Sequence, residues 1–188
     1  MNNIKRVYLF EPCFGKMTGH WESNCRRFSA EFKRLGIPFH IFCQTDPNPE
    51  IVSGLDITPV FSSASFADIS TPALFEQETN SFANDHKKID ASQFKEGDLL
   101  LFTTVMPQSH KAAMAWLEPI IKPKGPNAAF IFMIGAGDFD SYFMKRKFAL
   151  ALLNVPILRQ FAMRSLYTWN DSLYKKLYKT YIKKIICT

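Results

Sequence analysis

Short apolar runs along the chain alternate with longer segments in which apolar residues recur every three or four positions. Five of the runs have the length of buried strands: residues 7–10, 39–43, 57–61, 98–105 and 128–134. The last two runs are continuously apolar, as expected of central strands that are covered on both faces. Pro59 interrupts the third run, and because proline cannot donate a ladder hydrogen bond, we expect that strand at an edge of the sheet.

The segment between the first two runs predicts an amphipathic helix with clear ends. Its apolar residues follow spacings of four and three and therefore share one face: Trp21, Cys25, Phe28, Phe32 and Leu35. Gly36 ends the helix as a left-handed cap, and Pro38 prevents its continuation. Two further helices are predicted to open at Thr71–Pro72 and at Ser109, the second of which runs to Pro119.

This alternation of strands and helices indicates a Rossmann-like, doubly wound α/β fold. We expect a mostly parallel sheet of about five strands with helices on both faces. After the fifth run the pattern changes, and two or three helices follow one another with no strand between them. We therefore expect an α/β domain over residues 1–140 and a basic helical segment over 141–188 that packs on this domain or extends from it.

The composition is that of a globular protein, with 47% apolar and 21% charged residues. No stretch reaches the roughly 20 uninterrupted apolar residues of a membrane span, and the N-terminus lacks the apolar core of a signal peptide. The four cysteines form no CxxC pair and have no metal-ligand spacing with the histidines, which favours free thiols in a reducing compartment. These features predict a cytoplasmic protein without a metal or cofactor.

The net charge of +6 is unevenly distributed along the chain. Residues 1–144 carry 13 Lys and Arg against 16 Asp and Glu, whereas residues 145–188 carry 10 Lys and Arg against Asp171 alone. Three interpretations of this basic tail stay open: a solvated face, a peripheral contact with anionic lipid at the inner membrane face, or a nucleic-acid contact. The third is disfavoured, because the body of the chain is acidic and no recognition fold accompanies the tail.

Ligands of doubly wound sheets bind at the carboxyl ends of the strands, where the strand order reverses. With the order 3-2-1-4-5, the loops EPCFGKMTGH and MPQSHK line that point, and each brings a histidine to the first turn of a helix, His20 and His110. A helix N-terminus offers unpaired amides and positive potential, so it attracts an anion and disfavours imidazolium. A neutral histidine there could accept a proton from a hydroxyl group or donate a hydrogen bond to an oxyanion.

The glycines of the first loop have two interpretations. Gly15 and Gly19 would let the backbone approach a ligand closely, and Thr18 or Gly19 would cap the helix. Equally, both glycines would serve only the geometry of the turn, and a histidine beside them would be structural or simply exposed. A second glycine-rich stretch, GAGDFDS at 135–141, imitates a dinucleotide fingerprint, but Asp140 replaces the third glycine, so a helix cap is favoured there.

The first strand, the turn and helix ending in TGHWESNCRRFSAEFKRLGIPFHIF and the second strand resemble the start of a GT-B-fold glycosyltransferase. The helix exit Leu35–Gly36–Ile37–Pro38 and the segment FIFMIGAGDFDSYFMKRKFALALL are similar to the same family, so the likeness of pattern covers roughly residues 4–180. The resemblance implies an N-terminal, acceptor-side domain of an enzyme that transfers a sugar from a nucleotide-sugar donor to a glycan or lipid-linked acceptor.

The resemblance also implies roles for single residues. It places the donor diphosphate near Gly15, Thr18 and Gly19. It makes His20 the catalytic candidate, as a base or hydrogen-bonding residue that touches the acceptor or the transferred sugar. The two loops themselves add Lys16, Ser109 and His110, so the complete set of expected substrate-binding and donor-phosphate-binding residues is Gly15, Lys16, Thr18, Gly19, Ser109 and His110.

One departure from the family limits this expectation. The family's second domain binds the nucleotide-sugar, and this chain stops at KKIICT before such a domain begins. We therefore expect a truncated product, a fragment or one subunit of a split transferase, inactive without a separate donor-binding domain. The alternative is a non-catalytic Rossmann-like module that docks to an anionic membrane surface or a protein partner through its basic tail. A dinucleotide-dependent oxidoreductase is disfavoured, because no GxGxxG follows the first strand.

Overall fold

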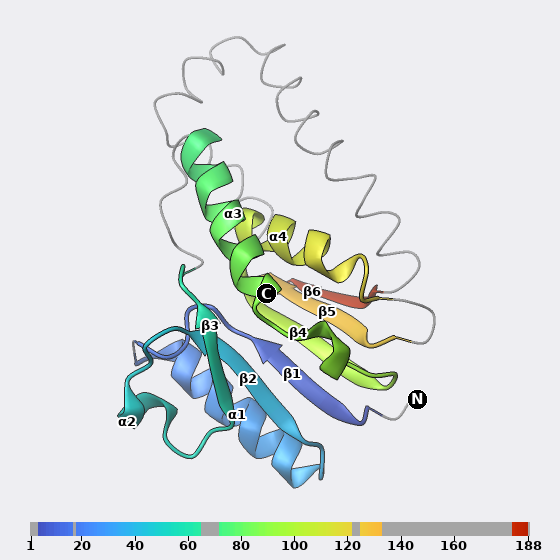
Figure 1. Ribbon diagram of the computed structural model, residues 1–188. Coiled ribbons are helices and arrows are strands. Elements are labelled where there is room, and N and C mark those ends of the chain that lie inside the picture. The colour runs from blue at the N-terminus through green and yellow to red at the C-terminus, as the bar shows by residue number, and fades with distance from the viewer. Residues whose placement is uncertain (1–3, 17, 65–71, 122–124, 133–181, 188) are drawn as a thin grey trace.

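The computed structural model describes residues 4–16, 18–64, 72–121, 125–132 and 182–187, which form a parallel sheet with flanking helices (Figure 1). The strands are β1 (Arg6–Phe10), β2 (Phe39–Gln44), β3 (Ile57–Phe61), β4 (Asp98–Val105), β5 (Asn127–Phe132) and β6 (Ile182–Cys187). The helices are α1 (His20–Arg34), α2 (Pro49–Val52), α3 (Pro72–Lys87) and α4 (Pro107–Leu117), with a 3₁₀ turn at Ala91–Gln93.

The sheet has the strand order β3-β2-β1-β4-β5-β6, and every neighbouring pair is parallel. The chain starts at the centre, moves outward to β3 and then returns to β4, so the order reverses between β1 and β4. This topology confirms the expected Rossmann-like α/β fold and the order of its first five strands. It also confirms the edge position of β3, where Pro59 stands opposite Cys43.

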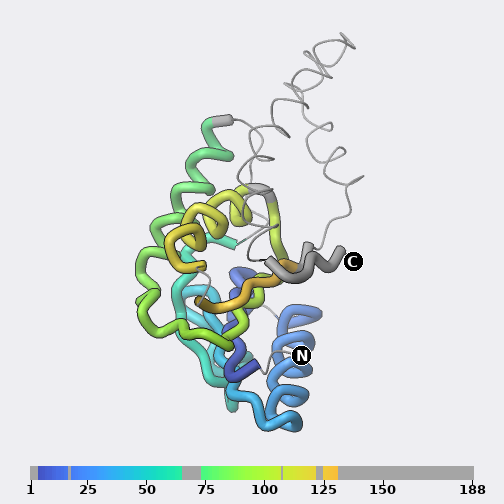
Figure 2. The backbone as a smooth tube through the Cα atoms, turned by 90° about the vertical axis from the view of Figure 1, so that its right-hand side faces the viewer, coloured from blue at the N-terminus to red at the C-terminus, as the bar shows by residue number. Residues whose placement is uncertain are grey.

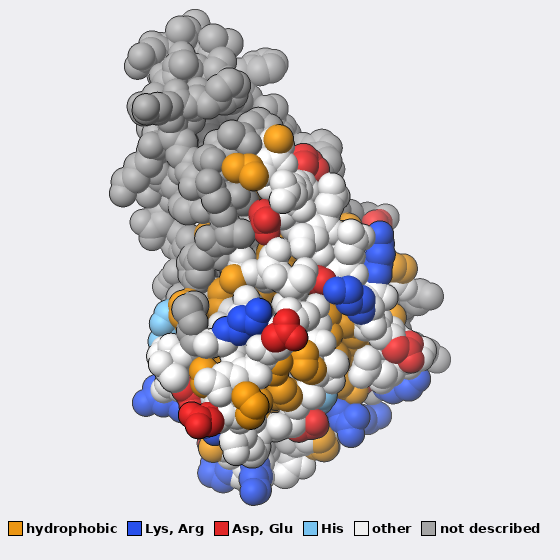
Figure 3. All heavy atoms as spheres, turned by 60° about the vertical axis from the view of Figure 1, so that its left-hand side comes forward, with side chains coloured by type: hydrophobic (Ala, Val, Ile, Leu, Met, Phe, Trp, Pro, Cys, Tyr) orange, Lys and Arg blue, Asp and Glu red, His pale blue; other side chains and the backbone are white. Residues whose placement is uncertain are grey.

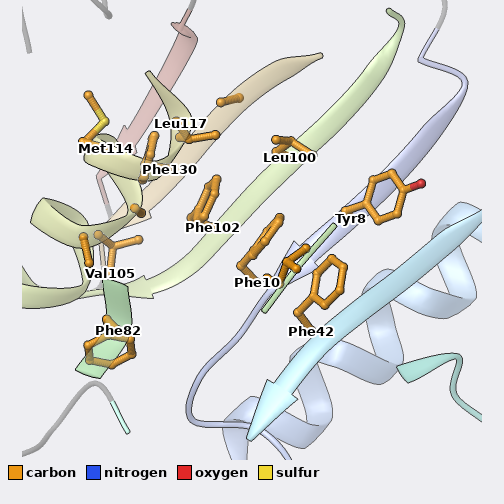
Figure 4. Close-up of a cluster of buried hydrophobic side chains, with 14 of the residues drawn as sticks. Tyr8, Phe10, Phe42, Phe82, Leu100, Phe102, Val105, Met114, Leu117 and Phe130 are labelled. Carbon is orange, nitrogen blue, oxygen red and sulfur yellow. The ribbon is translucent and has the colours of Figure 1, made fainter. Parts of the chain in front are cut away.

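Helices cover both faces of the sheet, with α1 on one side and α3 and α4 on the other (Figure 2). The face under α3 and α4 is rich in aromatic rings that continue from strand to strand (Figure 4). Phe10 of β1 stacks on Phe102 of β4 with ring centroids 4.3 Å apart, and Phe102 stacks on Phe130 of β5 at 4.7 Å. Fully burying each such ring contributes about 1.5–3 kcal/mol, so this row anchors the centre of the sheet.

Helix α1 ends as its sequence predicts. The Gly36 amide bonds the Lys33 carbonyl at 3.1 Å and the Ile37 amide bonds the Phe32 carbonyl at 2.9 Å, which is the Schellman pattern. Gly36 adopts φ +68° to allow it. The Arg26 guanidinium pairs with Glu22 at 2.8 Å and also donates to the Ile51 carbonyl at 2.9 Å, which ties α1 to α2.

Two expectations differ from the structure. Helix α4 begins at Pro107 rather than at Ser109, because proline is suited to the first helical position and Ser109 acts from the third. Residues 182–187, expected within the basic helical segment, form β6 instead and pair with β5. Isoleucine favours strands, and the ladder along β5 satisfies the backbone of this run. The rest of the expected segment, residues 141–181 and 188, and the GAGDFDS stretch at 135–141 lie outside the described residues.

The structure also tests what the sequence predicts for the cysteines, the surface charges and the absence of a membrane span. Cys13, Cys25 and Cys43 are buried and form no disulfide among the described residues. Burial raises the pKa of the Cys25 thiol strongly and that of Cys43 to about 11, so both are protonated at neutral pH. On the face in Figure 3, acidic and basic side chains are interspersed. None of the helices within the described ranges is both long enough and apolar enough to cross a membrane.

Candidate functional site

The carboxyl ends of β1 and β4 lie side by side at the point where the strand order reverses. The chain leaves β1 toward α1 on one face and leaves β4 toward α4 on the other (Figure 1). Open α/β sheets bind their ligands at this point. Three segments meet there: the β1–α1 turn, the end of β4 and the first turn of α4.

Glu11 is the first residue after β1, and its side chain is buried, with 4% of the residue exposed. Its carboxyl oxygens accept hydrogen bonds from the Cys13 amide at 3.1 Å and from the Thr104 hydroxyl at 2.6 Å. Burial raises the pKa of Glu11, while bonds from Thr104, Thr103 and the Cys13 amide act in the opposite direction. A buried carboxyl group therefore links the β1–α1 turn to the end of β4.

Thr104 occupies an unusual backbone conformation, with φ +52°. The left-handed region is disfavoured for a β-branched residue and costs of the order of 1–3 kcal/mol. The register between β4 and β5 shifts between Phe102 and Val105, so the strand bulges at this point. Strain of this kind persists where the surroundings enforce it and is concentrated at functional sites.

The two glycines of the β1–α1 turn have different roles. Gly15 is buried at φ +125°, and a Cβ added to it would lie 3.1 Å from the Pro47 Cβ. Its carbonyl accepts a hydrogen bond from the Asn48 amide at 2.8 Å. Gly15 thus packs the turn against the loop that follows β2. This favours the interpretation in which Gly15 serves the geometry of the turn and not the approach of a ligand.

Gly19 is the N-cap of α1 and is exposed, with φ +121° and ψ −147°. This conformation is almost restricted to glycine, yet a Cβ at Gly19 would have no atom within 4 Å. Gly19, rather than Thr18, is therefore the cap, and within the described residues no side chain supplies a capping hydrogen bond. Lys16, Thr18 and His20 are exposed around it, and the His20 ring lies 4.0 Å from the Trp21 ring.

The residues expected from the second loop are buried. The Ser109 hydroxyl accepts from the Met106 amide and donates to the Met106 carbonyl, both at 3.0 Å, and so closes the first turn of α4. His110 is 6% exposed and packs against Phe130 at 4.9 Å, and burial lowers its pKa to about 3. The sequence predicts a crevice lined by both histidines. His20 is exposed, but His110 is buried and would have to become exposed to line such a crevice.

No protein-family model, curated protein or solved structure matches the chain. The functional interpretation therefore depends on the fold and on the geometry of this edge of the sheet. Within the described ranges, no group of three or more His, Cys, Asp or Glu side chains could hold a metal ion.

Sequence reasoning missed Glu11 and the two threonines at the end of β4. A signal for each exists in retrospect. Glu11 is an acid placed directly after a buried strand, and Thr103 and Thr104 are the polar residues inside an otherwise apolar run. Neither signal indicates that the three side chains share one hydrogen-bond network.

Proposed function

We propose that this chain is the acceptor-side half of a GT-B-type glycosyltransferase. It would transfer a sugar from a nucleotide-sugar to a glycan or lipid-linked acceptor, together with a separate donor-binding domain. The observation that carries the proposal is the open glycine corner: Gly19 holds a conformation suited to glycine alone, at the N-terminus of a helix that follows the central strand β1. The space beside it is unfilled, so a ligand can approach the backbone there.

The corner has the physical properties that a diphosphate requires. A helix N-terminus carries roughly half a positive charge, and its first amides point outward along the axis. No side chain of the described residues caps this end, so the amides of His20 and Glu22 are available to phosphate oxygens. Glu22 lies in the same turn, but its carboxylate pairs with Arg26 at 2.8 Å, which reduces its repulsion of an anion. The exposed Lys16 adds a cation nearby.

His20 is the side chain best placed to act on a sugar acceptor. It is exposed, it belongs to the same first turn, and the neighbouring Trp21 ring limits its orientations. An imidazole in that place would accept a proton from an acceptor hydroxyl group. The buried His110 and Ser109 would support this edge of the sheet rather than contact the donor.

The test is calorimetric titration of the full chain with nucleoside diphosphates and nucleotide-sugars. Gly19→Ala is expected to weaken binding at least tenfold, because it disturbs the turn that presents the amides. Gly36→Ala is the matched control, since Gly36 also has positive φ and open surroundings but lies at the other end of α1. Absence of binding to every nucleotide, or equal effects of the two variants, would refute the proposed donor site.

The alternative function, docking through the basic tail, concerns residues of which the structure describes only 182–187. Co-sedimentation with vesicles of increasing anionic lipid content addresses it separately. Salt-sensitive binding to these vesicles, in a chain that binds no nucleotide, would favour the alternative over sugar transfer.

A further inference from the structure

A small, partly open cavity lies between α3, α4 and the carboxyl ends of β1 and β4. Its volume is about 20 Å³. A space of this size admits one water-sized group, because a water molecule needs roughly 10–15 Å³ measured in this way. Its walls are mainly aromatic: Phe10, Phe61, Phe82, Phe102 and Phe130. Three polar side chains, from His86, Thr103 and Ser109, also line it.

His86 presents an unsatisfied acceptor within this apolar surrounding. The residue is 2% exposed, and its Nδ1 lies 2.7 Å from the Phe82 carbonyl oxygen. A carbonyl oxygen can only accept, so Nδ1 carries the proton and donates it. Burial lowers the pKa of His86 to about 4, so the ring is neutral at pH 7 and Nε2 is a bare acceptor. Nε2 is buried and has no hydrogen-bond partner in the described part of the chain.

The two hydroxyl groups cannot supply the missing donor, because their protons are already used. Thr103 donates to the Phe10 carbonyl at 3.4 Å, and Ser109 donates to the Met106 carbonyl at 3.0 Å. Each hydroxyl oxygen therefore has only acceptor capacity left for the cavity. The lining requires an occupant that donates a hydrogen bond.

We propose that this cavity binds the terminal hydroxyl group of an apolar alcohol, which donates to His86 Nε2. The volume admits the hydroxyl group, and the apolar body extends along the phenylalanine lining toward the open side of the cavity. A polyhydroxylated ligand would leave further hydroxyl groups unpaired against those rings. An ammonium group would lose its hydration with no carboxylate in the lining to compensate. This site does not depend on sugar transfer.

The experiment compares benzyl alcohol with ethylbenzene, which has the same shape with a methyl group in place of the hydroxyl. Both are titrated into the full chain labelled with ¹⁵N-histidine, and the Nε2 resonance of His86 is followed by NMR. Benzyl alcohol is expected to shift this resonance saturably, because the lone pair of Nε2 gains a donor. Ethylbenzene is expected to leave it in place.

Two variants sharpen the result. His86→Phe keeps an aromatic ring but removes the Nε2 acceptor, and it should weaken the binding of benzyl alcohol, measured by calorimetry, about fivefold. Thr79→Val is the control, because Thr79 is buried on the same helix as His86 but bonds the Phe75 carbonyl and does not line the cavity. It should leave the affinity unchanged.

Equal responses to the two probes would overturn the proposal, since recognition would then not involve the hydroxyl group. So would a His86 resonance that stays constant up to the solubility limit of benzyl alcohol, which would mean that the cavity holds water alone. Equal losses of affinity in His86→Phe and Thr79→Val would also contradict it, because the effect would then be a general loss of packing.

Discussion

The Thr104 hydroxyl lies 2.6 Å from a carboxyl oxygen of Glu11, and it reaches that position from a backbone with φ +52°. The second carboxyl oxygen of Glu11 accepts from the Cys13 amide, inside the turn that leads to α1. The strained end of β4 and the β1–α1 turn are thus joined through one buried side chain.

Glu11 by itself is expected to contribute a stability that falls with rising pH, opposite to the contribution of the buried histidines. Its pKa is raised in the folded state, so the folded protein keeps this proton after the unfolded chain has lost it at pH about 4.5. The contribution is complete below pH 4.5 and is lost as pH rises through the folded pKa. The difference between urea denaturation of the wild-type protein and of Glu11→Gln across pH 4–8 measures this contribution. Glu11→Gln should lack it, and an unchanged dependence of stability on pH in that variant would contradict the assignment.

The hydroxyl group of Thr104, rather than the shape of its side chain, should account for its contribution to the free energy of unfolding. Thr104→Val keeps the β-branch and the strain but leaves Glu11 without one donor, so the free energy of unfolding should fall by about 1–3 kcal/mol. Thr104→Ser keeps the hydroxyl and should cost less than 1 kcal/mol. Equal losses in the two variants, measured by denaturant unfolding, would show that packing dominates at this residue.

The glycines of the β1–α1 turn should differ in their response to alanine. Both substitutions impose about 1–3 kcal/mol of backbone strain. Gly15→Ala adds a Cβ only 3.1 Å from the Pro47 Cβ, whereas Gly19→Ala meets open space. We expect Gly15→Ala to lower the melting temperature more than Gly19→Ala does. The reverse order would mean that the loop after β2 yields easily.

The buried histidines should destabilise the protein in acid. Burial lowers the folded-state pKa of His86 to about 4 and that of His110 to about 3, from 6.5. The unfolded chain therefore takes up protons first, and stability is lost as pH falls from about 6.5 through the folded values. His110→Phe should flatten the pH dependence between pH 6.5 and 4 in urea denaturation. Parallel curves for the variant and the wild-type protein would contradict this expectation.

The fold was predictable because each of the strands β1 to β5 is built on a short, mainly apolar run. Parallel strands covered on both faces leave that signature, and the expected runs match β1 to β5 within one or two residues. The strand β6 was not predictable in this way, because lysines interrupt IKKIIC and a helical pattern precedes it. Its pairing depends on β5, which is some 50 residues away in the chain.

The site was only partly predictable. The sequence places Gly15 and Gly19 in one turn and indicates no difference between them, since the contact with Pro47 comes from another loop. The sequence also does not indicate the conformation of Thr104, because this residue lies where the pairing of β4 with β5 shifts its register. The local sequence pattern therefore predicted which loops lie at the carboxyl edge of the sheet. Contacts between distant segments determine which residues of these loops are buried and which are exposed.

The most direct test of the donor site is a titration of the ¹⁵N-labelled chain with a nucleoside diphosphate, followed through the backbone amide resonances. We expect the largest shifts at His20 and Glu22, with much smaller changes at Gly15, whose carbonyl and Cα are packed against the loop after β2. Absence of saturable shifts in the first turn of α1, or shifts confined to another edge of the sheet, would contradict a diphosphate site at this corner.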